Sequence, residues 1–297
     1  MANQEIQAIK DMLLSGRDPN APQPSVEEMR ERYAALGGAF PVSDDIKVTP
    51  TELKGVPTEH ICPPDADEGL ALLYFHGGGY ALGGFVTHRS LVADLARASG
   101  RHGFLIDYRL APEHSFPAPV EDAVFAYQAL LEMGYEPSRI VIAGDSAGGG
   151  LTLATLMALK EAGVGLPAAA LCISPWADLE MTGHSHATKA EEDPMVRQAD
   201  LQKWADIYLK GSDPKHPHAS PIHGDFSGLP PLLIQVGTAE TLLDDARMIK
   251  ARADAAGVTA ELQEWDEMIH VWHHFAPVVT DARNAIAQAA QFFARFA

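Results

Sequence analysis

The chain is poor in cysteine and in positive charge, and each shortage excludes a class of protein. Only Cys62 and Cys172 occur among 297 residues, so no disulfide framework can form, and we expect two buried, reduced thiols. Lysine and arginine number 22 against 40 aspartates and glutamates, which gives a formal net charge of −18. Nucleic acids and anionic membrane surfaces repel so acidic a protein. We therefore expect a small neutral ligand or substrate and no nucleic-acid partner.

Long apolar runs are missing as well. No run in the sequence is long enough to span a bilayer, and the first residues lack the basic start and apolar core of a signal peptide. We therefore predict no stable membrane insertion and a cytoplasmic location. Hydrophobic residues make up 46% of the chain and charged residues 21%, which is ordinary for a globular protein. A chain of this length can bury a large core as one α/β domain.

Short runs rich in β-branched residues alternate with longer helical patterns along most of the chain. We predict edge strands at 46–48 and 58–62 and a central strand at 70–75. Further strands are expected at 104–108, 140–143, 169–174, 232–236 and 259–265, with helices at 87–99, 119–133, after 151, after 242 and at the C-terminus. Such alternation predicts a mostly parallel central sheet with helices on both faces.

Two segments do not follow this alternation. Residues 1–45 have apolar side chains at helical spacing and a capping box that begins at Ser25, so we predict a helical cap segment there. Residues 178–228 show no strand pattern and one helical pattern near 200–209. We interpret them as a cap insertion within a domain that spans 46–297. The candidates for lining a pocket under this insertion are Met195, Trp204 and Tyr208.

The segment 144–148, Gly-Asp-Ser-Ala-Gly, lies between a strand pattern and a helix pattern. A serine at the top of so sharp a turn has strained backbone, and small neighbours let the strand and the helix approach closely. In this context the pattern indicates a nucleophile elbow. Ser146 would present its hydroxyl at a helix N-terminus, where free N–H groups favour negative charge. Taken alone, the motif is also compatible with a glycine-rich turn that has no chemical role.

The segment 76–79, His-Gly-Gly-Gly, directly follows the predicted central strand. Successive glycines expose backbone N–H groups with no side chain in the way, as an oxyanion hole requires. The spacing does not match the G-x-G-x-x-G of a dinucleotide-binding loop, and the chain has no Gly-Lys pair for a phosphate-binding P-loop. A purely structural glycine turn is the remaining alternative.

An acidic residue and a histidine follow the last two predicted strands. Glu240 lies after the strand at 232–236, and His270 lies after the strand at 259–265. With Ser146 they give the chain order serine, acid, histidine. This order is that of the α/β-hydrolases rather than of other folds that use such a triad.

Together these motifs resemble the hormone-sensitive lipase family of esterases, bacterial family IV, and the likeness covers nearly the whole chain. It rests on the segments 76–79 and 144–148, on Tyr-Arg-Leu-Ala-Pro-Glu at 108–113, and on the loops of the acid and the histidine. The resemblance implies an α/β-hydrolase fold with a helical cap. It also implies a homodimer that forms through the strand at 259–265.

The same resemblance assigns roles to individual residues. Ser146 is expected to be the nucleophile and His270 the general base. The oxyanion hole is expected from the N–H groups of Gly78, Gly79 and Ala147. His76 and Glu113 are expected to support the loop geometry without taking part in the chemistry.

The orienting acid is the one departure from the family pattern. Many members carry Asp followed by Pro-Leu, whereas this chain has Glu240 followed by Thr-Leu. The resemblance therefore assigns the acid to Glu240, whose extra methylene requires a small backbone shift. Asp244 is the rival, but it lies within the following helix, where a first-turn carboxylate has an ordinary structural role.

The other histidines receive no catalytic role. His273 and His274 follow Trp272 into the expected start of the last helix, and we interpret them as capping or surface residues. The histidine pairs at 184 and 186 and at 216 and 218 have no acidic or cysteine partner at ligand spacing. We therefore predict no functional metal at these pairs.

The sequence thus predicts a serine carboxylesterase that hydrolyses short to medium acyl-chain esters through an acyl-enzyme intermediate, with no cofactor or metal. A lactone hydrolase with the same three catalytic residues is an open alternative, because only the pocket would differ. A non-catalytic small-molecule receptor is the second alternative. It is disfavoured because the chain retains every catalytic element.

Overall fold

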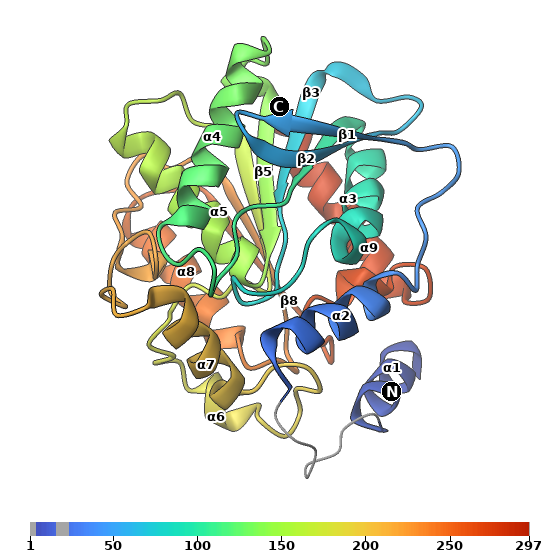
Figure 1. The fold of residues 1–297 in the computed structure, drawn as a ribbon, viewed down its shortest axis with the longest axis vertical. Coiled ribbons are helices and arrows are strands. Elements are labelled where there is room, and N and C mark those ends of the chain that lie inside the picture. The colour runs from blue at the N-terminus through green and yellow to red at the C-terminus, as the bar shows by residue number, and fades with distance from the viewer. Residues whose placement is uncertain (1–3, 16–23, 297) are drawn as a thin grey trace.

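The computed structural model describes residues 4–15 and 24–296, and an eight-stranded sheet runs through its centre (Figure 1). The strand order is β1-β2-β4-β3-β5-β6-β7-β8. The strands are β1 (Lys47–Leu53), β2 (Val56–Cys62), β3 (Asp67–Phe75), β4 (Arg101–Ile106), β5 (Ile140–Asp145), β6 (Ala169–Ile173), β7 (Leu232–Gly237) and β8 (Ala260–Trp265). Strand β2 pairs antiparallel with β1 and β4, and every pair from β4 to β8 is parallel.

The burial of each strand agrees with its position in the sheet. Strands β5, β6 and β7 are buried at every residue, as expected for parallel strands that are covered on both faces. Strand β8 is mostly half-buried and lies at one edge of the sheet. Because parallel strands point the same way, their carboxyl ends and the loops that follow gather at one end of the sheet, where such folds bind their ligands.

Five long helices cover the two faces of the sheet. Helices α3 (Phe85–Ser99) and α9 (Thr280–Phe293) pack together on one face, and α4 (Ala118–Glu132), α5 (Ala147–Glu161) and α8 (Leu243–Ala255) cover the other (Figure 1). Three 3₁₀ helices lie in the connections: η1 (Pro137–Arg139), η2 (Pro221–His223) and η3 (Trp272–Phe275). The predicted mostly parallel sheet with helices on both faces is therefore confirmed.

Two further pairs of helices lie at one end of the molecule. Helices α1 (Gln4–Ser15) and α2 (Val26–Gly37) come from the N-terminal segment, and α6 (Ser185–Thr188) and α7 (Gln198–Leu209) from the predicted insertion (Figure 1). Helix α2 begins with the predicted capping box, because Ser25 N donates to Glu28 Oε2 at 2.7 Å and Glu28 N donates to Ser25 Oγ at 3.2 Å. The division into a cap segment at 1–45 and a domain at 46–297 stays a prediction.

Three local predictions were wrong. Residues 58–62 belong to β2, which lies between β1 and β4 and is therefore not an edge strand. The insertion contains α6 and η2 in addition to the one helix expected. The last helix begins only at Thr280, and η3 occupies the segment that was expected to start it.

Two findings concern the membrane and the cysteines. Within residues 4–15 and 24–296, no helix is both long and apolar enough to cross a bilayer. Cys62 and Cys172 are both free thiols, as expected. Cys172 is buried as expected, whereas the expected burial of Cys62 was wrong, because this thiol is only partly buried.

Candidate active site

The turn between β5 and α5 places Ser146 in strained backbone. Its φ and ψ angles are +54° and −121°, a conformation that costs a residue with a side chain about 1–3 kcal/mol. The surroundings hold this conformation, because Ser146 N donates to Ile173 O and Trp176 N donates to Ser146 O, both at 2.9 Å. Strand, turn and helix are therefore arranged as in a nucleophile elbow.

Glycines on either side of the serine permit this turn. A Cβ atom at Gly144 would lie 2.2 Å from Gly148 O, and one at Gly148 would lie 2.0 Å from Phe75 O. Both distances are far below contact distance, so only glycine fits. The two glycines let the start of α5 rest against the ends of β5 and β3.

The structure brings Glu240 and His270 together. His270 Nδ1 lies 2.8 Å from Glu240 Oε2, and because an ionised carboxylate only accepts, the histidine N–H donates. The other oxygen, Glu240 Oε1, accepts from Ser174 Oγ at 2.9 Å and from Gly237 N at 2.5 Å. Ser174 Oγ also accepts from Val271 N at 3.1 Å. One serine thus links the loop of the acid to the loop of the histidine.

Burial and the hydrogen bond between the two residues shift the pKa values of His270 and Glu240 in opposite directions. Burial alone would lower the pKa of His270, but the hydrogen bond to Glu240 and the charge of that residue outweigh it and raise the pKa above its ordinary 6.5. Burial raises the pKa of Glu240, although the hydrogen bond from His270 opposes the change. The imidazole therefore holds a proton more tightly than a free histidine does.

The glycine loop after β3 leaves backbone donors free. Gly78 and Gly79 have φ angles of +119° and +61°, which glycine adopts without penalty. In the part of the chain that the structure describes, the N–H groups of Gly78, Gly79 and Ala147 donate to no protein acceptor. Free N–H groups beside a nucleophile can stabilise a developing oxyanion.

A cavity of about 230 Å³ joins these elements. It is lined by Gly78, Gly79, Ser146 and His270 together with apolar side chains, among them Met195 and Trp204. Of the three residues of the insertion that were predicted to line a pocket, Met195 and Trp204 therefore do so. Tyr208 does not, because it is buried against Tyr80 with the two rings stacked at 3.8 Å.

A second cavity, of about 330 Å³, lies directly beside the first. It is mainly apolar and extends under α1, where Ile9, Met12 and Leu13 line it. The side chains that line both cavities are Tyr33, Met195 and His274. These three residues form the wall between the cavity that contains Ser146 and the cavity under α1.

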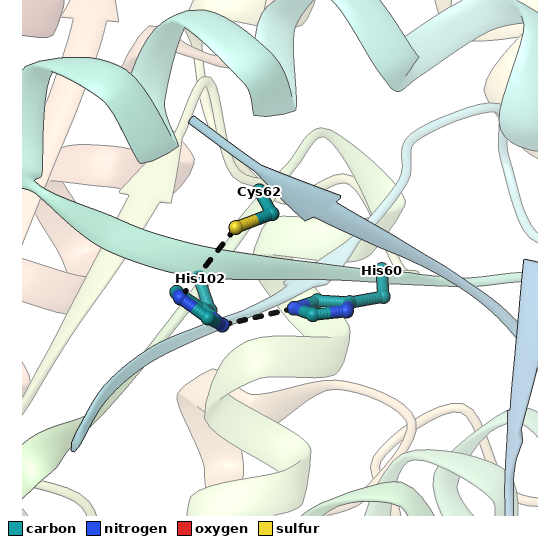
Figure 2. Close-up of side chains that lie close together, drawn as sticks. All are labelled: His60, Cys62 and His102. Atoms are coloured by element: carbon teal, nitrogen blue, oxygen red, sulfur yellow. Dashed lines mark hydrogen bonds between the residues drawn. The ribbon is translucent and has the colours of Figure 1, made fainter. Parts of the chain in front are cut away.

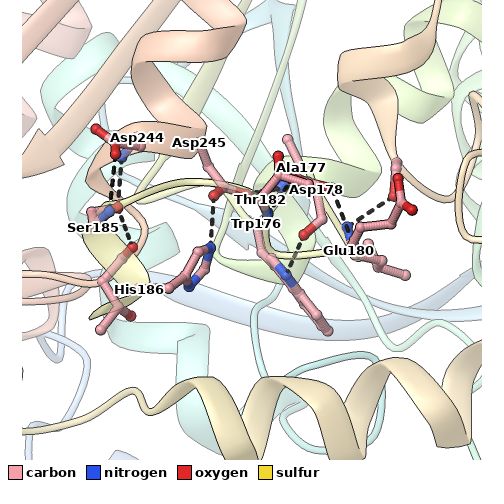
Figure 3. Close-up of polar contacts among 12 residues, drawn as sticks. Trp176, Ala177, Asp178, Glu180, Thr182, Ser185, His186, Asp244 and Asp245 are labelled. Atoms are coloured by element: carbon pink, nitrogen blue, oxygen red, sulfur yellow. Dashed lines mark hydrogen bonds and ion pairs between the residues drawn. The ribbon is translucent and has the colours of Figure 1, made fainter. Parts of the chain in front are cut away.

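Asp244, the rival acid, lies in a different environment. Its carboxylate accepts from Ser185 N at 2.9 Å and pairs with Arg247 at 3.2 Å. Figure 3 shows it at the start of α8, facing the short helix α6 of the insertion. Asp244 therefore attaches the insertion to α8 and makes no contact with His270 among the described hydrogen bonds.

The neighbouring Asp245 attaches the insertion a second time. Its Oδ2 accepts from Ala177 N at 2.9 Å and from Asp178 N at 3.0 Å. Its Oδ1 faces His186 Nε2 at 3.3 Å (Figure 3). The histidine pair that contains His186 thus has an acidic partner from another element, a contact that spacing along the chain could not reveal.

The interpretation of His273 and His274 as capping or surface residues was wrong. Only 1% of His273 is exposed, and its Nε2 lies 2.9 Å from Gln235 Oε1 of β7. His274 lines both cavities. Both lie in η3, which packs against the sheet instead of starting the last helix. Burial lowers the pKa of each to about 3, so both are neutral.

Asp145, the second residue of the 144–148 motif, has contacts that its position in the motif does not reveal. Its buried carboxylate accepts from Tyr74 Oη at 2.8 Å and from Gly77 N at 3.1 Å, and it lies 3.2 Å from His88 Nε2. Asp145 therefore ties the serine turn to the start of the glycine loop. These partners come from β3, the loop after it and α3, so no local pattern could identify them.

Glu113 and His76 make contacts around the same loop without lining the cavity. Glu113 pairs with Arg30 of α2 at 2.8 Å, and Arg30 also donates to the carbonyls of Ala81 and Ala111. His76 stacks on Tyr108 at 4.2 Å, and burial lowers its pKa to about 3. Glu113 thus acts on the loop region through Arg30, and His76 is part of the loop; neither lines the cavity, in line with the supporting role expected for them.

Comparisons with known proteins agree with this geometry. A family model for the α/β-hydrolase fold matches residues 72–274. An acetyl-hydrolase of Streptomyces hygroscopicus is 46% identical over 98% of this chain and 97% of its own length. An esterase of Acinetobacter venetianus is 34% identical over 92% of this chain and 88% of its own.

Solved structures give the same result. A crystal structure of an esterase from the bacterial hormone-sensitive lipase family is 46% identical, superposes with a TM-score of 0.96, and covers 100% of this chain and 99% of that one. The structure of the relative EstE5 superposes with a TM-score of 0.96 at 45% identity over 99% of each chain. The chain therefore belongs to the hormone-sensitive lipase family of esterases, with the α/β-hydrolase fold.

Proposed function

We propose that the protein is a serine carboxylesterase that hydrolyses short to medium acyl-chain esters through an acyl-enzyme intermediate. One observation carries the proposal above all: His270, which is hydrogen-bonded to the buried Glu240, lines the same cavity as Ser146, and Ser146 occupies a strained turn. A nucleophile, a base and a buried acid that orients the base are the parts that acyl transfer requires.

Acylation begins with removal of a proton. His270 Nε2 takes the proton of Ser146 Oγ, and the oxygen attacks the ester carbonyl carbon. Glu240 holds the imidazole by its Nδ1–H and stabilises the imidazolium that forms. The imidazolium then protonates the departing alcohol, and the acyl group stays on Ser146. In the second half, His270 activates a water molecule that releases the acid and restores the serine.

The developing oxyanion would be held by backbone N–H groups of Gly78, Gly79 and Ala147. All three are without protein acceptors, so binding the oxyanion displaces no hydrogen bond within the described chain. One such donor is typically worth about 3 kcal/mol of transition-state stabilisation. Asp145 and Arg30 support this role because they fix the glycine loop from its two sides.

The size of the cavity favours a small acyl group. About 230 Å³ is less than the roughly 300–1,000 Å³ of pockets that take drug-sized ligands. One relative is named an acetyl-hydrolase, and the solved structures of EstE5 include one that was soaked with p-nitrophenyl butyrate and one described as EstE5-PMSF. By analogy we assign short acyl esters to the cavity at Ser146, with the cavity under α1 as the extension for medium chains.

The test is steady-state hydrolysis of p-nitrophenyl esters from acetate to laurate, with a medium-ring lactone alongside. Ser146→Ala is compared with Ser43→Ala, which changes an exposed serine that lines neither cavity. We expect turnover to be highest for the short esters and to be lost only in Ser146→Ala. A lactone that outruns every ester would move the substrate class to lactones. No turnover, with Ser146 unlabelled by a serine-reactive phosphonate, would favour a receptor.

We further propose that the protein forms a homodimer through the strand predicted at 259–265. This segment contains β8, which lies at the edge of the sheet with half-buried side chains. An edge strand presents unpaired N–H and C=O groups that a second copy can pair with.

A further inference from the structure

Three clusters of potential metal ligands occur among the described residues. In one of them, Asp145 is already engaged by Tyr74, Gly77 and His88. In another, Asp178 accepts from the backbone of Glu180 and from Thr182. Those carboxylates are therefore already occupied by hydrogen bonds within the protein. The third cluster, His60, Cys62 and His102, consists of two imidazoles and a thiol.

The third cluster is built by two neighbouring strands. His60 lies opposite Phe104 in the antiparallel pairing of β2 with β4, and the same register continued by two residues sets Cys62 opposite His102. Alternate residues of a strand share one face, so the three side chains point to the same side. Figure 2 shows them turned toward one another from the two strands.

The contacts within the cluster are short. His60 Nε2 lies 3.0 Å from His102 Nδ1, and Cys62 Sγ lies 3.6 Å from His102 Nε2. The ring of His60 stacks on Phe104 with 4.8 Å between the ring centres, which limits its rotation. Taking one ligand atom from each residue, all three atoms lie within 4.8 Å of one another.

We propose that His60, Cys62 and His102 bind a divalent transition metal, with Zn²⁺ as the preferred ion. The donor set decides the class, because imidazole nitrogen and thiolate sulfur favour Zn²⁺ and its neighbours over Mg²⁺ or Ca²⁺. Three protein ligands leave the fourth tetrahedral position to water. The proposal does not depend on the proposed esterase activity.

The distances suit a tetrahedral site after a small contraction. Bond lengths of about 2.0–2.1 Å to nitrogen and about 2.3 Å to sulfur separate two nitrogens by about 3.3 Å and a nitrogen from the sulfur by about 3.6 Å. The longest separation within the cluster, up to 4.8 Å, therefore has to shorten by up to about 1.5 Å, which rotation of the His102 and Cys62 side chains can supply. One nitrogen of His102 becomes a ligand, and the other is left to a hydrogen bond.

The protonation states also suit a metal. Burial, followed by the charges of His102 and Lys47, lowers the pKa of His60, so its imidazole is neutral and can ligate. On binding, the Cys62 thiol releases its proton to the solvent and the thiolate bonds the metal, so one proton leaves for each ion bound. The hydrogen bonds given up are the 3.0 Å and 3.6 Å contacts within the cluster and the one that the Cys62 thiol donates to Pro63 O at 3.6 Å.

The site is remote from the active site. His102 is the second residue of β4, and Tyr108, which contacts the glycine loop, lies six residues further along the chain. At about 3.3 Å per residue, the four steps from His102 to Ile106 at the end of β4 span about 13 Å, and the glycine loop lies beyond that end. A metal at the cluster would join β2 to β4 and stabilise the sheet where the β1–β2 hairpin is attached.

The experiment is titration of EDTA-treated, reduced protein with Co²⁺ and with Zn²⁺. We expect a thiolate-to-cobalt charge-transfer band that saturates at one ion per chain and that Zn²⁺ abolishes. Zn²⁺ should also protect one thiol from alkylation. Cys62→Ser, His60→Ala and His102→Ala should each weaken Zn²⁺ binding by more than about 100-fold, because losing a direct ligand costs more than the 10–100-fold of an outer-shell change.

Cys172→Ala is the matched control, because it removes the other cysteine and should keep the charge-transfer band. His60→Gln provides a second variant in case the alanine variant does not fold, and circular dichroism of metal-free samples checks this. A wild-type protein that gives no thiolate band, or a Cys62→Ser variant that keeps it, would overturn the proposal. Binding that persists without a thiolate band would assign the ions to other histidines.

Discussion

The carboxylate of Glu240 is held in one orientation by groups on both sides. Ser174 and Gly237 take one oxygen, which leaves the other to His270. Asp193 of the insertion accepts from Thr241 N at 2.8 Å, so the residue after the acid is fixed as well. The longer side chain of a glutamate can therefore stand where many family members carry aspartate, because its surroundings determine where its oxygens lie.

Glu240→Gln and Asp244→Asn distinguish the two candidate acids. Glu240→Gln should lower kcat by about 10³–10⁴-fold, because an amide in this place favours the wrong tautomer of the histidine. Asp244→Asn should leave kcat nearly unchanged and cost about 1 kcal/mol of unfolding free energy, from weaker contacts to Ser185 and Arg247. Steady-state kinetics with p-nitrophenyl butyrate and urea unfolding measure both. A larger loss of kcat in Asp244→Asn would refute the assignment.

The raised pKa of His270 predicts the pH dependence of the reaction. The base must be unprotonated to accept the serine proton, so kcat/KM should fall as the pH drops through a pKa above the ordinary 6.5. Glu240→Gln removes the charge that raises this pKa, and the acid limb should then move to lower pH. Profiles of kcat/KM from pH 5 to 9 test this. An acid limb that stays in place in the variant would speak against pairing with Glu240.

At the scale of elements, the insertion is attached to α8 by side chains rather than by a shared apolar core alone. Asp244 and Asp245 bind the segment from Ala177 to Ser185 (Figure 3). Further along, the same insertion contributes Met195 and Trp204 to the cavity at Ser146. The insertion is thus placed by the start of α8 and in turn sets the wall of the cavity.

Met195→Ala should change the acyl-chain preference, because Met195 lines both cavities. Its removal joins the space at Ser146 to the apolar space under α1. Burying each added methylene there is worth about 0.8 kcal/mol, so kcat/KM for octanoate relative to butyrate should rise by up to about fourfold per methylene. Met133→Ala, which alters an exposed methionine, is the control. An unchanged ratio would show that the two cavities are not used by one substrate.

At the scale of the whole molecule, the two ends of the sheet differ. The carboxyl ends of β3, β5, β7 and β8 lead into the loops that contain the candidate active site. The cluster of His60, Cys62 and His102 lies toward the opposite end. The two edge strands differ too, because β1 is exposed at four of its seven residues, whereas β8 is half-buried at five of its six.

The proposed dimer predicts a mass of twice the 31.9 kDa of the chain. Sedimentation velocity over a range of concentrations should show this mass. Hydrogen exchange at residues 260–265 should be slow at high protein concentration and faster after dilution, because pairing with a second copy protects the outer backbone groups of β8. A monomer at all concentrations, or exchange that is independent of concentration, would argue against a dimer through β8.

The alternation of strands and helices, the turn at Ser146 and the positions of Glu240 and His270 were all predictable from the sequence. Each depends on short-range chemistry: apolar periodicity, glycines beside the serine, and a polar residue where a strand ends. The contact between Glu240 and His270 followed because neighbouring parallel strands end at the same edge of the sheet. The predicted ends of helices and strands were less accurate, as the start of α9 at Thr280 shows.

Only the tertiary structure decided the remaining contacts. Asp145 meets Tyr74 and His88, and Cys62 meets His102, across 40 to 71 residues of chain. The buried place of His273 against Gln235 likewise depends on how η3 packs on β7. Local patterns determine which backbone a segment adopts, whereas long-range contacts depend on strand register and helix packing, which are fixed by the burial of the whole core at once.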